Sequence, residues 1–151
     1  MTPDHVQQEE FIQTTTPIYT FPKGMPGFDQ LRQFTLKEYN EVFSLLSAVD
    51  QPEVTFITVN PFDFHANYEF VLPDEAIQDI EVSDREQVAV RCIVTWHSDR
   101  DKSTVNLLAP LVFNIKNLKG KQIVLQNTSY STKHLLWTEN ERIRTGEGGD
   151  S

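Results

Sequence analysis

The side chains that come closest to a catalytic arrangement lie in one segment, Ser129-Tyr130-Ser131-Thr132-Lys133-His134. A serine near a histidine can act as a nucleophile, because the imidazole can take the hydroxyl proton. Ser129 or Ser131 with His134 would form such a pair. The surrounding residues lack the Gly-x-Ser-x-Gly turn of many hydrolases, and no nearby loop offers an oxyanion hole. Serines and threonines that satisfy backbone groups in a loop are the simpler interpretation, and a small hydrolase that uses Ser131 and His134 is the alternative.

Nucleotide and metal chemistry find less support. The phosphate-binding loop needs a glycine directly before Lys-Ser or Lys-Thr, whereas Lys102-Ser103 follows Asp101 and Gly120-Lys121 precedes Gln122. The histidines are too scattered for the close ligand spacing of a zinc site; they are His5, His65, His97 and His134. We therefore predict a non-enzymatic protein with no metal and no cofactor.

The elements that must position these residues are strands. From Val105 to Ile115 every second residue is apolar, and successive side chains of a strand face opposite sides, so the pattern predicts one buried face. The other face mixes amides with apolar groups and suits a contact surface; it carries Asn106, Leu108, Pro110, Val112 and Asn114. Pro110 predicts an edge, a bend or a bulge within this strand.

Similar alternation predicts a further strand at Val88–His97, and short apolar runs predict others at Phe34–Leu36, Val42–Val49 and Val54–Val59, with a weaker candidate at Phe11–Thr16. Asn117-Leu118-Lys119-Gly120 predicts a hairpin turn before another strand at Gln122–Gln126. Short helices are predicted at Pro73–Ile80 and Thr132–Asn140. The fold class is therefore mainly β, a small antiparallel barrel of short strands with one or two short helices.

Length and composition suit one domain. We expect an N-terminal tail at residues 1–9, a single barrel domain at 10–138 and a flexible tail at 139–151. No run approaches the roughly 20 apolar residues of a membrane span, and the first residues do not resemble a signal peptide. The single cysteine, Cys92, has no partner for a disulfide within the chain, which favours a reduced, cytoplasmic setting.

The charge is strongly acidic and unevenly spread. The formal net charge is -9, and residues 1–86 hold sixteen acidic and four basic side chains. Direct binding to a nucleic acid is disfavoured, because that affinity depends largely on neutralising phosphates. An acidic first half can instead attract a basic protein.

Aromatic side chains mark a second candidate contact segment. Pro61-Phe62-Asp63-Phe64-His65-Ala66-Asn67-Tyr68 brings three aromatic residues into a connection between strands. At least one of them is expected to cap the barrel. The others can anchor a partner, because aromatic residues are enriched at interaction hot spots.

Five short stretches occur in an order that carries a family resemblance. They are Thr20-Phe21-Pro22-Lys23-Gly24-Met25-Pro26-Gly27-Phe28, Val59-Asn60-Pro61-Phe62, Tyr68-Glu69-Phe70-Val71-Leu72-Pro73, Asn106-Leu107-Leu108-Ala109-Pro110 and Ser129-Tyr130-Ser131-Thr132. Together they resemble the flagellar assembly factor FliW family over roughly residues 18 to 136. The segment from Glu10 to Ile18 departs from the usual first strand of that family.

The resemblance implies a function that composition does not show. FliW-like proteins are cytoplasmic and non-enzymatic, and they bind flagellin and the carbon storage regulator CsrA. CsrA is a small basic RNA-binding dimer that represses flagellin translation, and FliW freed by flagellin export sequesters it. The implied fold is a small pseudo-barrel capped by a helix. A structural subunit of a larger assembly is a further alternative to this function.

The contact segments and the family motifs together predict a set of partner-binding residues. They are Pro61, Phe62, Tyr68, Asn106, Leu108, Asn114, Ser129, Tyr130 and His134. The free protein is expected to be monomeric and to bind neither a nucleic acid nor a membrane.

Overall fold

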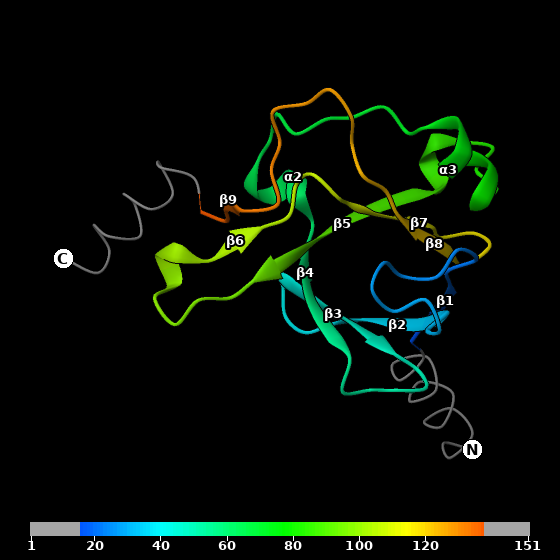
Figure 1. The fold of residues 1–151 in the computed structure, drawn as a ribbon, viewed down its shortest axis with the longest axis horizontal. Coiled ribbons are helices and arrows are strands. Elements are labelled where there is room, and N and C mark those ends of the chain that lie inside the picture. Colours follow the sequence, from blue (N-terminus) through cyan, green and yellow to red (C-terminus); the bar gives the residue numbers. More distant parts are fainter. Residues whose placement is uncertain (1–15, 138–151) are drawn as a thin grey trace, which may run out of the picture.

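The centre of the structure is a closed barrel of short strands. The computed structural model describes residues 16–137, and Figure 1 shows their arrangement. The strands are β1 (Ile18–Thr20), β2 (Gln33–Glu38), β3 (Phe43–Ala48), β4 (Thr55–Val59), β5 (Val88–Thr95), β6 (Thr104–Val105), β7 (Leu111–Asn114), β8 (Lys119–Gln122) and β9 (His134–Leu135). They form one sheet in the order β4-β3-β2-β1-β8-β7-β5-β6-β9, and a further pairing of β4 with β5 closes the first seven of these into a barrel. The predicted mainly β barrel is confirmed.

One strand pairing departs from the predicted antiparallel arrangement. β1 runs parallel to β8, with Thr20 opposite Lys119, whereas the other pairings between described strands are antiparallel. Thr20 N donates a hydrogen bond to the carbonyl oxygen of Leu118 at 2.9 Å. The two strands are far apart in the chain, so no turn motif could have specified their pairing.

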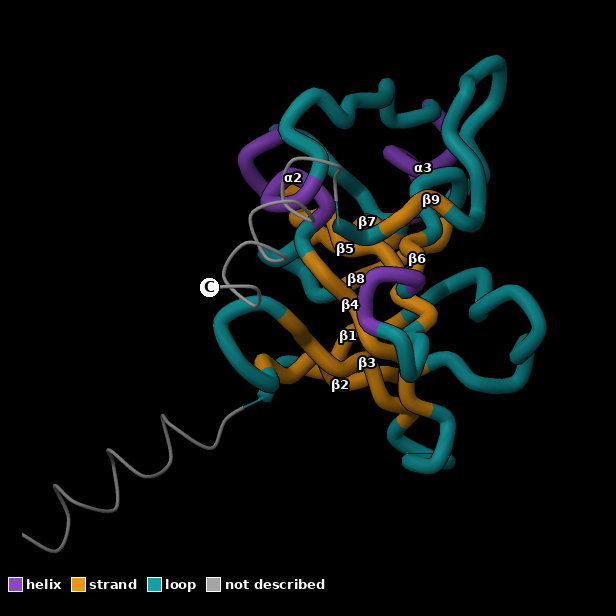
Figure 2. The backbone as a smooth tube through the Cα atoms, turned by 90° about the vertical axis from the view of Figure 1, so that its left-hand side faces the viewer, coloured by secondary structure: helices purple, strands orange, loops and turns teal. Residues whose placement is uncertain are grey.

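Short helices and loops cover one outer side of the barrel (Figure 2). The helices are α2 (Pro61–Phe64) and α3 (Asp74–Asp79), with two 3-10 turns, η1 (Arg85–Gln87) and η2 (Arg100–Lys102). α3 confirms the predicted helix at Pro73–Ile80. α2 was predicted only as a connection between strands; Asn60 caps it, because its Oδ1 accepts a hydrogen bond from Phe62 N at 3.0 Å. In the described part of the chain, no helix is long and apolar enough to cross a membrane.

The barrel strands contribute to two apolar cores, because alternate side chains face opposite sides of the sheet. The core inside the barrel includes Phe21, Phe34, Leu46, Leu111 and Phe113. The outer core lies between β4, β5 and β7 and the segments that cover them, and it includes Val59, Ile80, Cys92, Val112 and Leu136. On β5, Ala89 and Ile93 pack against the inner core, whereas Val88 and Val90 pack against the outer core.

The single amphipathic strand predicted from Val105 to Ile115 is wrong. The chain instead forms β6 and β7 with a bend between them, as Pro110 had suggested. All four residues of β7 are buried, because that strand is covered on both sides. Ile115, expected on the buried face, is 52% exposed.

Other predicted elements are partly correct. The hairpin turn is confirmed between β7 and β8, but the second strand is Lys119–Gln122 instead of Gln122–Gln126. The described part of the predicted helix at Thr132–Asn140 holds β9, so that helix is wrong there. The strand at Phe11–Thr16 lies outside the described residues except for Thr16, which is not in a strand. Both predicted tails also lie outside them.

Candidate protein-binding surfaces

Tyr68 is the centre of an aromatic cluster on the covered side of the barrel. Its ring lies 4.7 Å from that of Tyr130, 5.6 Å from that of Phe70 and 5.8 Å from that of Phe62, measured between centroids. The side chain is only 4% exposed, and its hydroxyl donates a hydrogen bond to the carbonyl oxygen of Leu107 at 2.7 Å. Burial raises the pKa of Tyr68 well above its ordinary value, so this hydroxyl keeps its proton. We call Phe62, Tyr68, Phe70, Tyr130 and His134 the aromatic cluster.

Tyr130 holds the chain after β8 against this cluster. Its hydroxyl oxygen accepts a hydrogen bond from Glu69 N at 3.1 Å, and its ring lies 6.0 Å from that of His134. The amides of Leu107 and Leu108 both donate to the carbonyl oxygen of Ser131, at 3.1 and 3.2 Å. Segments about 60 residues apart therefore meet at one surface.

The proposed hydrolase pair of Ser131 and His134 finds no support in the hydrogen bonds. Ser131 Oγ accepts a hydrogen bond from Lys133 N at 3.3 Å, and within residues 16–137 no hydrogen bond joins it to His134. Burial, followed by the nearby His65, lowers the pKa of His134 below its ordinary value. A second potential nucleophile, Cys92, is unreactive at neutral pH, because burial raises the pKa of its thiol to about 12.

The structure places the remaining predicted contact residues differently. Asn106 is partly buried, and its Oδ1 accepts a hydrogen bond from Ala109 N at 2.9 Å, which holds the bend after β6. Pro61 is buried at the start of α2, whereas Ser129 is exposed. The expected outward face is wrong for Asn114, which is only 1% exposed. Its amide donates to the carbonyl oxygen of Ile80 at 2.9 Å, because β7 is covered there by the end of α3.

A wide apolar groove continues from the aromatic cluster toward α3. Its volume is about 830 Å³. Outward-facing residues of β5, the segment at residues 68–72 and α3 with the loop after it line the groove, which we call the α3 groove. Phe70, Leu72, Ile77, Val82, Val88 and Val90 supply most of its apolar lining. The groove was not predicted from the sequence, although an apolar run outside the predicted strands, Phe70-Val71-Leu72, is a signal for it.

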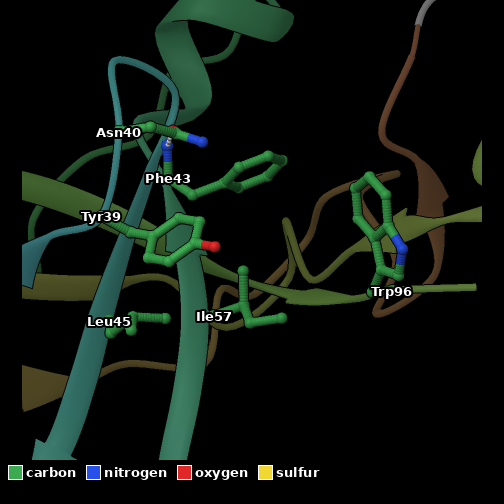
Figure 3. Close-up of a pocket in the computed structure, with 6 residues that line it drawn as sticks. All are labelled: Tyr39, Asn40, Phe43, Leu45, Ile57 and Trp96. Atoms are coloured by element: carbon green, nitrogen blue, oxygen red, sulfur yellow. Dashed lines mark hydrogen bonds between the residues drawn. The ribbon is translucent and has the colours of Figure 1, made fainter.

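A second hollow lies on the outer face of β3 and β4. Figure 3 shows the rings of Tyr39, Phe43 and Trp96 around one space, with Leu45 and Ile57 in the lower part of the view. The Phe43 and Trp96 rings meet edge to face at 5.6 Å, and Trp96 is 47% exposed. This Trp96 pocket measures about 300 Å³. No single stretch of sequence indicates it, because its lining comes from β3, from β4 and from the segments that follow β2 and β5.

A family model described as FliW protein matches residues 5–136 of the chain. The chain belongs to the FliW family. Flagellar assembly factor FliW of Clostridium novyi (strain NT) is 41% identical over 124 residues, covering 81% of this chain and 87% of the relative. The relative of the same name in Pseudothermotoga lettingae is 41% identical over 130 residues, covering 85% of this chain and 83% of the relative.

A solved structure supports the same assignment. The crystal structure of the flagellar assembly factor FliW matches with a TM-score of 0.79 and 36% sequence identity, covering 82% of this chain and 87% of that chain. The predicted family and the barrel fold of this FliW-family chain are thereby confirmed. The name assembly factor, which these relatives bear, implies a non-enzymatic role. The partner-binding residues named from the sequence stay predictions.

The buried hydroxyl of Tyr68 provides a test of the aromatic cluster. We expect Tyr68→Phe to lower the free energy of unfolding by about 1 to 2 kcal/mol, because the carbonyl oxygen of Leu107 loses its buried donor. Tyr39→Phe removes an exposed hydroxyl and is expected to change the same quantity little. Urea unfolding followed by circular dichroism measures both variants, and equal effects would show that the Tyr68 hydrogen bond adds no stability.

Proposed function

We propose that this chain is a cytoplasmic, non-enzymatic flagellar assembly factor that binds flagellin and antagonises CsrA by protein–protein contact. Sequestering CsrA would relieve its repression of flagellin translation. The observation that carries the proposal is membership of the FliW family over nearly all of the described residues. The curated relatives bear the name flagellar assembly factor FliW.

The surface of the described residues supports a role in protein binding. The α3 groove and the Trp96 pocket are both apolar hollows open to solvent, and hollows of this kind favour partner binding. The aromatic cluster brings several predicted contact residues together beside the α3 groove. Tyrosine and tryptophan, which are enriched at interaction hot spots, line these surfaces.

Binding of the purified full-length chain to flagellin and to CsrA tests the proposal directly. Calorimetry is expected to show saturable binding to each partner, and a competition titration is expected to show that one partner weakens or displaces the other. The Asn106→Ala/Tyr130→Ala variant is expected to bind at least one of them more weakly if these residues form contacts. Wild-type affinity of that folded variant for both partners would remove the two residues from the contact surface.

The outcome for the unaltered chain decides the function itself. Absence of binding to both partners would overturn the proposal. Binding to both with no mutual effect would retain the two partners but remove the switch between them.

A further inference from the structure

We infer that the α3 groove is the docking site for a cationic amphipathic segment of a partner protein. Apolar side chains of that segment would enter the groove, and its lysine or arginine side chains would meet acidic groups at the rim. The inference rests on the proposed function, because it assigns the chemistry of a partner to a surface of a partner-binding protein.

The apolar interior of the groove is open to solvent and unfilled by side chains of the described residues. Its volume of about 830 Å³ has room for several aliphatic side chains. Phe70, Leu72 and Val82 pack against the outer core yet remain only partly buried, and Ile77, which also lines the groove, is partly buried as well. Covering them would remove apolar area from water, which is worth about 25 cal/mol per Å².

One wall of the groove also offers free backbone groups. Glu69 N donates to the Tyr130 hydroxyl, but in the described chain no backbone hydrogen bond uses the amides of Phe70, Val71 or Leu72. Val71 is 88% exposed, so the middle of this stretch faces solvent, while Phe70 and Leu72 on either side pack against the outer core. A bound segment can therefore hydrogen-bond to the wall as well as fill the groove.

The charges at the rim select a cationic partner. Glu69, Asp84 and Arg85 line the groove, and Asp74, Glu75 and Glu86 are exposed on α3 and η1 beside it. The three lysines near α3 offset these acids by only one charge, because they face two carboxylates of their own. Lys23 and Lys121 contact Asp79, and Lys119 contacts Glu81. The remaining acidic excess complements lysine and arginine.

Synthetic peptides test this inference on the full-length chain. The probe is a 14-residue peptide in which leucine and lysine alternate, so that an extended chain carries leucine on one side and lysine on the other. It is compared with an analogue in which glutamate replaces lysine and with a peptide of scrambled order. We expect calorimetry to show that the lysine peptide binds at least tenfold more tightly than both. Equal affinity for the glutamate analogue would overturn the assigned charge, and equal affinity for the scrambled peptide would overturn the amphipathic requirement.

Matched variants locate the binding site. Glu69→Lys at the rim and Val71→Asn on the wall are each expected to weaken the lysine peptide at least threefold. Their controls, Glu53→Lys and Val49→Asn, alter exposed residues that do not line the groove and are expected to bind as the unaltered chain does. Equal effects of the groove variants and their controls would place the peptide elsewhere and overturn the inference.

Titration of the same variants with CsrA and flagellin separates the two proposals. A loss of affinity for either partner in the groove variants alone is the expected result. Unchanged affinity for both partners would overturn the inference while the proposed function stands. Absence of partner binding by the unaltered chain would overturn the proposed function, whereas the peptide result would still decide the chemistry of the groove.

Discussion

Replacing Gly120 with alanine is expected to lower the free energy of unfolding by about 2 to 3 kcal/mol, through overpacking of the inner core. A Cβ at this position would lie 2.7 Å from Cε1 of Phe21 and 3.1 Å from Cδ1 of Phe113. Both rings are fully buried inside the barrel, so neither can move aside without disturbing its neighbours. Urea unfolding of the purified variant measures the loss.

A second substitution separates this clash from a loss of strand propensity. Phe21→Leu removes the ring that the new methyl group would meet, so the double variant Gly120→Ala/Phe21→Leu should lose less stability than the sum of the single variants. Strict additivity would show that the contact between residues 21 and 120 is not the cause. The same geometry explains why β8 carries a glycine opposite Phe113.

Removal of the Asn114 side chain is expected to cost about 2 to 4 kcal/mol, because a buried network loses both its donor and its acceptor. Nδ2 donates to the carbonyl oxygens of Ile80 and Glu81 at 2.9 and 3.2 Å. Oδ1 accepts from the amides of Lys116 and Asn117 at 3.0 and 3.3 Å. Asn114→Ala thus removes a donor from the carbonyl oxygens of Ile80 and Glu81 and the acceptor of the Lys116 and Asn117 amides; the Ile80 oxygen keeps one bond, from Asn117 Nδ2.

Asn117→Ala is the matched control for this network. Asn117 also donates to the carbonyl oxygen of Ile80, at 3.2 Å, but its side chain is exposed, so we expect a loss below about 1 kcal/mol. Hydrogen exchange should become faster at the amides of Ile77 and Ile80 in Asn114→Ala, because Asn114 anchors the end of α3. Equal stability losses in the two asparagine variants would contradict the anchoring role.

These predictions bear on function through the position of α3. Ile77 lies on this helix and lines the α3 groove, and Asn114 together with the Asp79–Lys121 ion pair at 2.9 Å holds the helix to the hairpin of β7 and β8. An asparagine that the sequence suggested as a partner contact therefore acts from within the protein. Its substitution would weaken binding at the groove by loosening one wall.

Local sequence patterns predicted most of the strands and one helix. The run of β-branched and aromatic residues at Val54–Val59 and the alternation along Val88–His97 are properties of neighbouring residues, and they match β4 and β5 closely. Alternation failed along Val105–Ile115, because β7 is buried on both faces and its pattern no longer separates inside from outside. The α2 helix was missed because a single turn capped by Asn60 has no hydrophobic period to detect.

The arrangement of the candidate binding surfaces was harder to predict from the sequence than the strands were, because it depends on the tertiary structure. The sequence indicated that Phe62, Tyr68, Tyr130 and His134 were contact candidates, but it could not show that Tyr68 is buried while Tyr130 bridges to Glu69. Burial of a side chain depends on which distant segments pack over it. The same reason explains why Asn114 was expected to face outward.

By itself, the sequence determined the mainly β class, most of the central strands and the family, because those follow from local periodicity and from motifs of a few residues each. Only the tertiary structure decided the parallel pairing of β1 with β8 and the closure of β4 on β5. It also decided the α3 groove, whose lining comes from segments at residues 62, 68–72, 77 and 82–90. Contacts between distant segments depend on the packing of the whole chain, which no short stretch of sequence specifies.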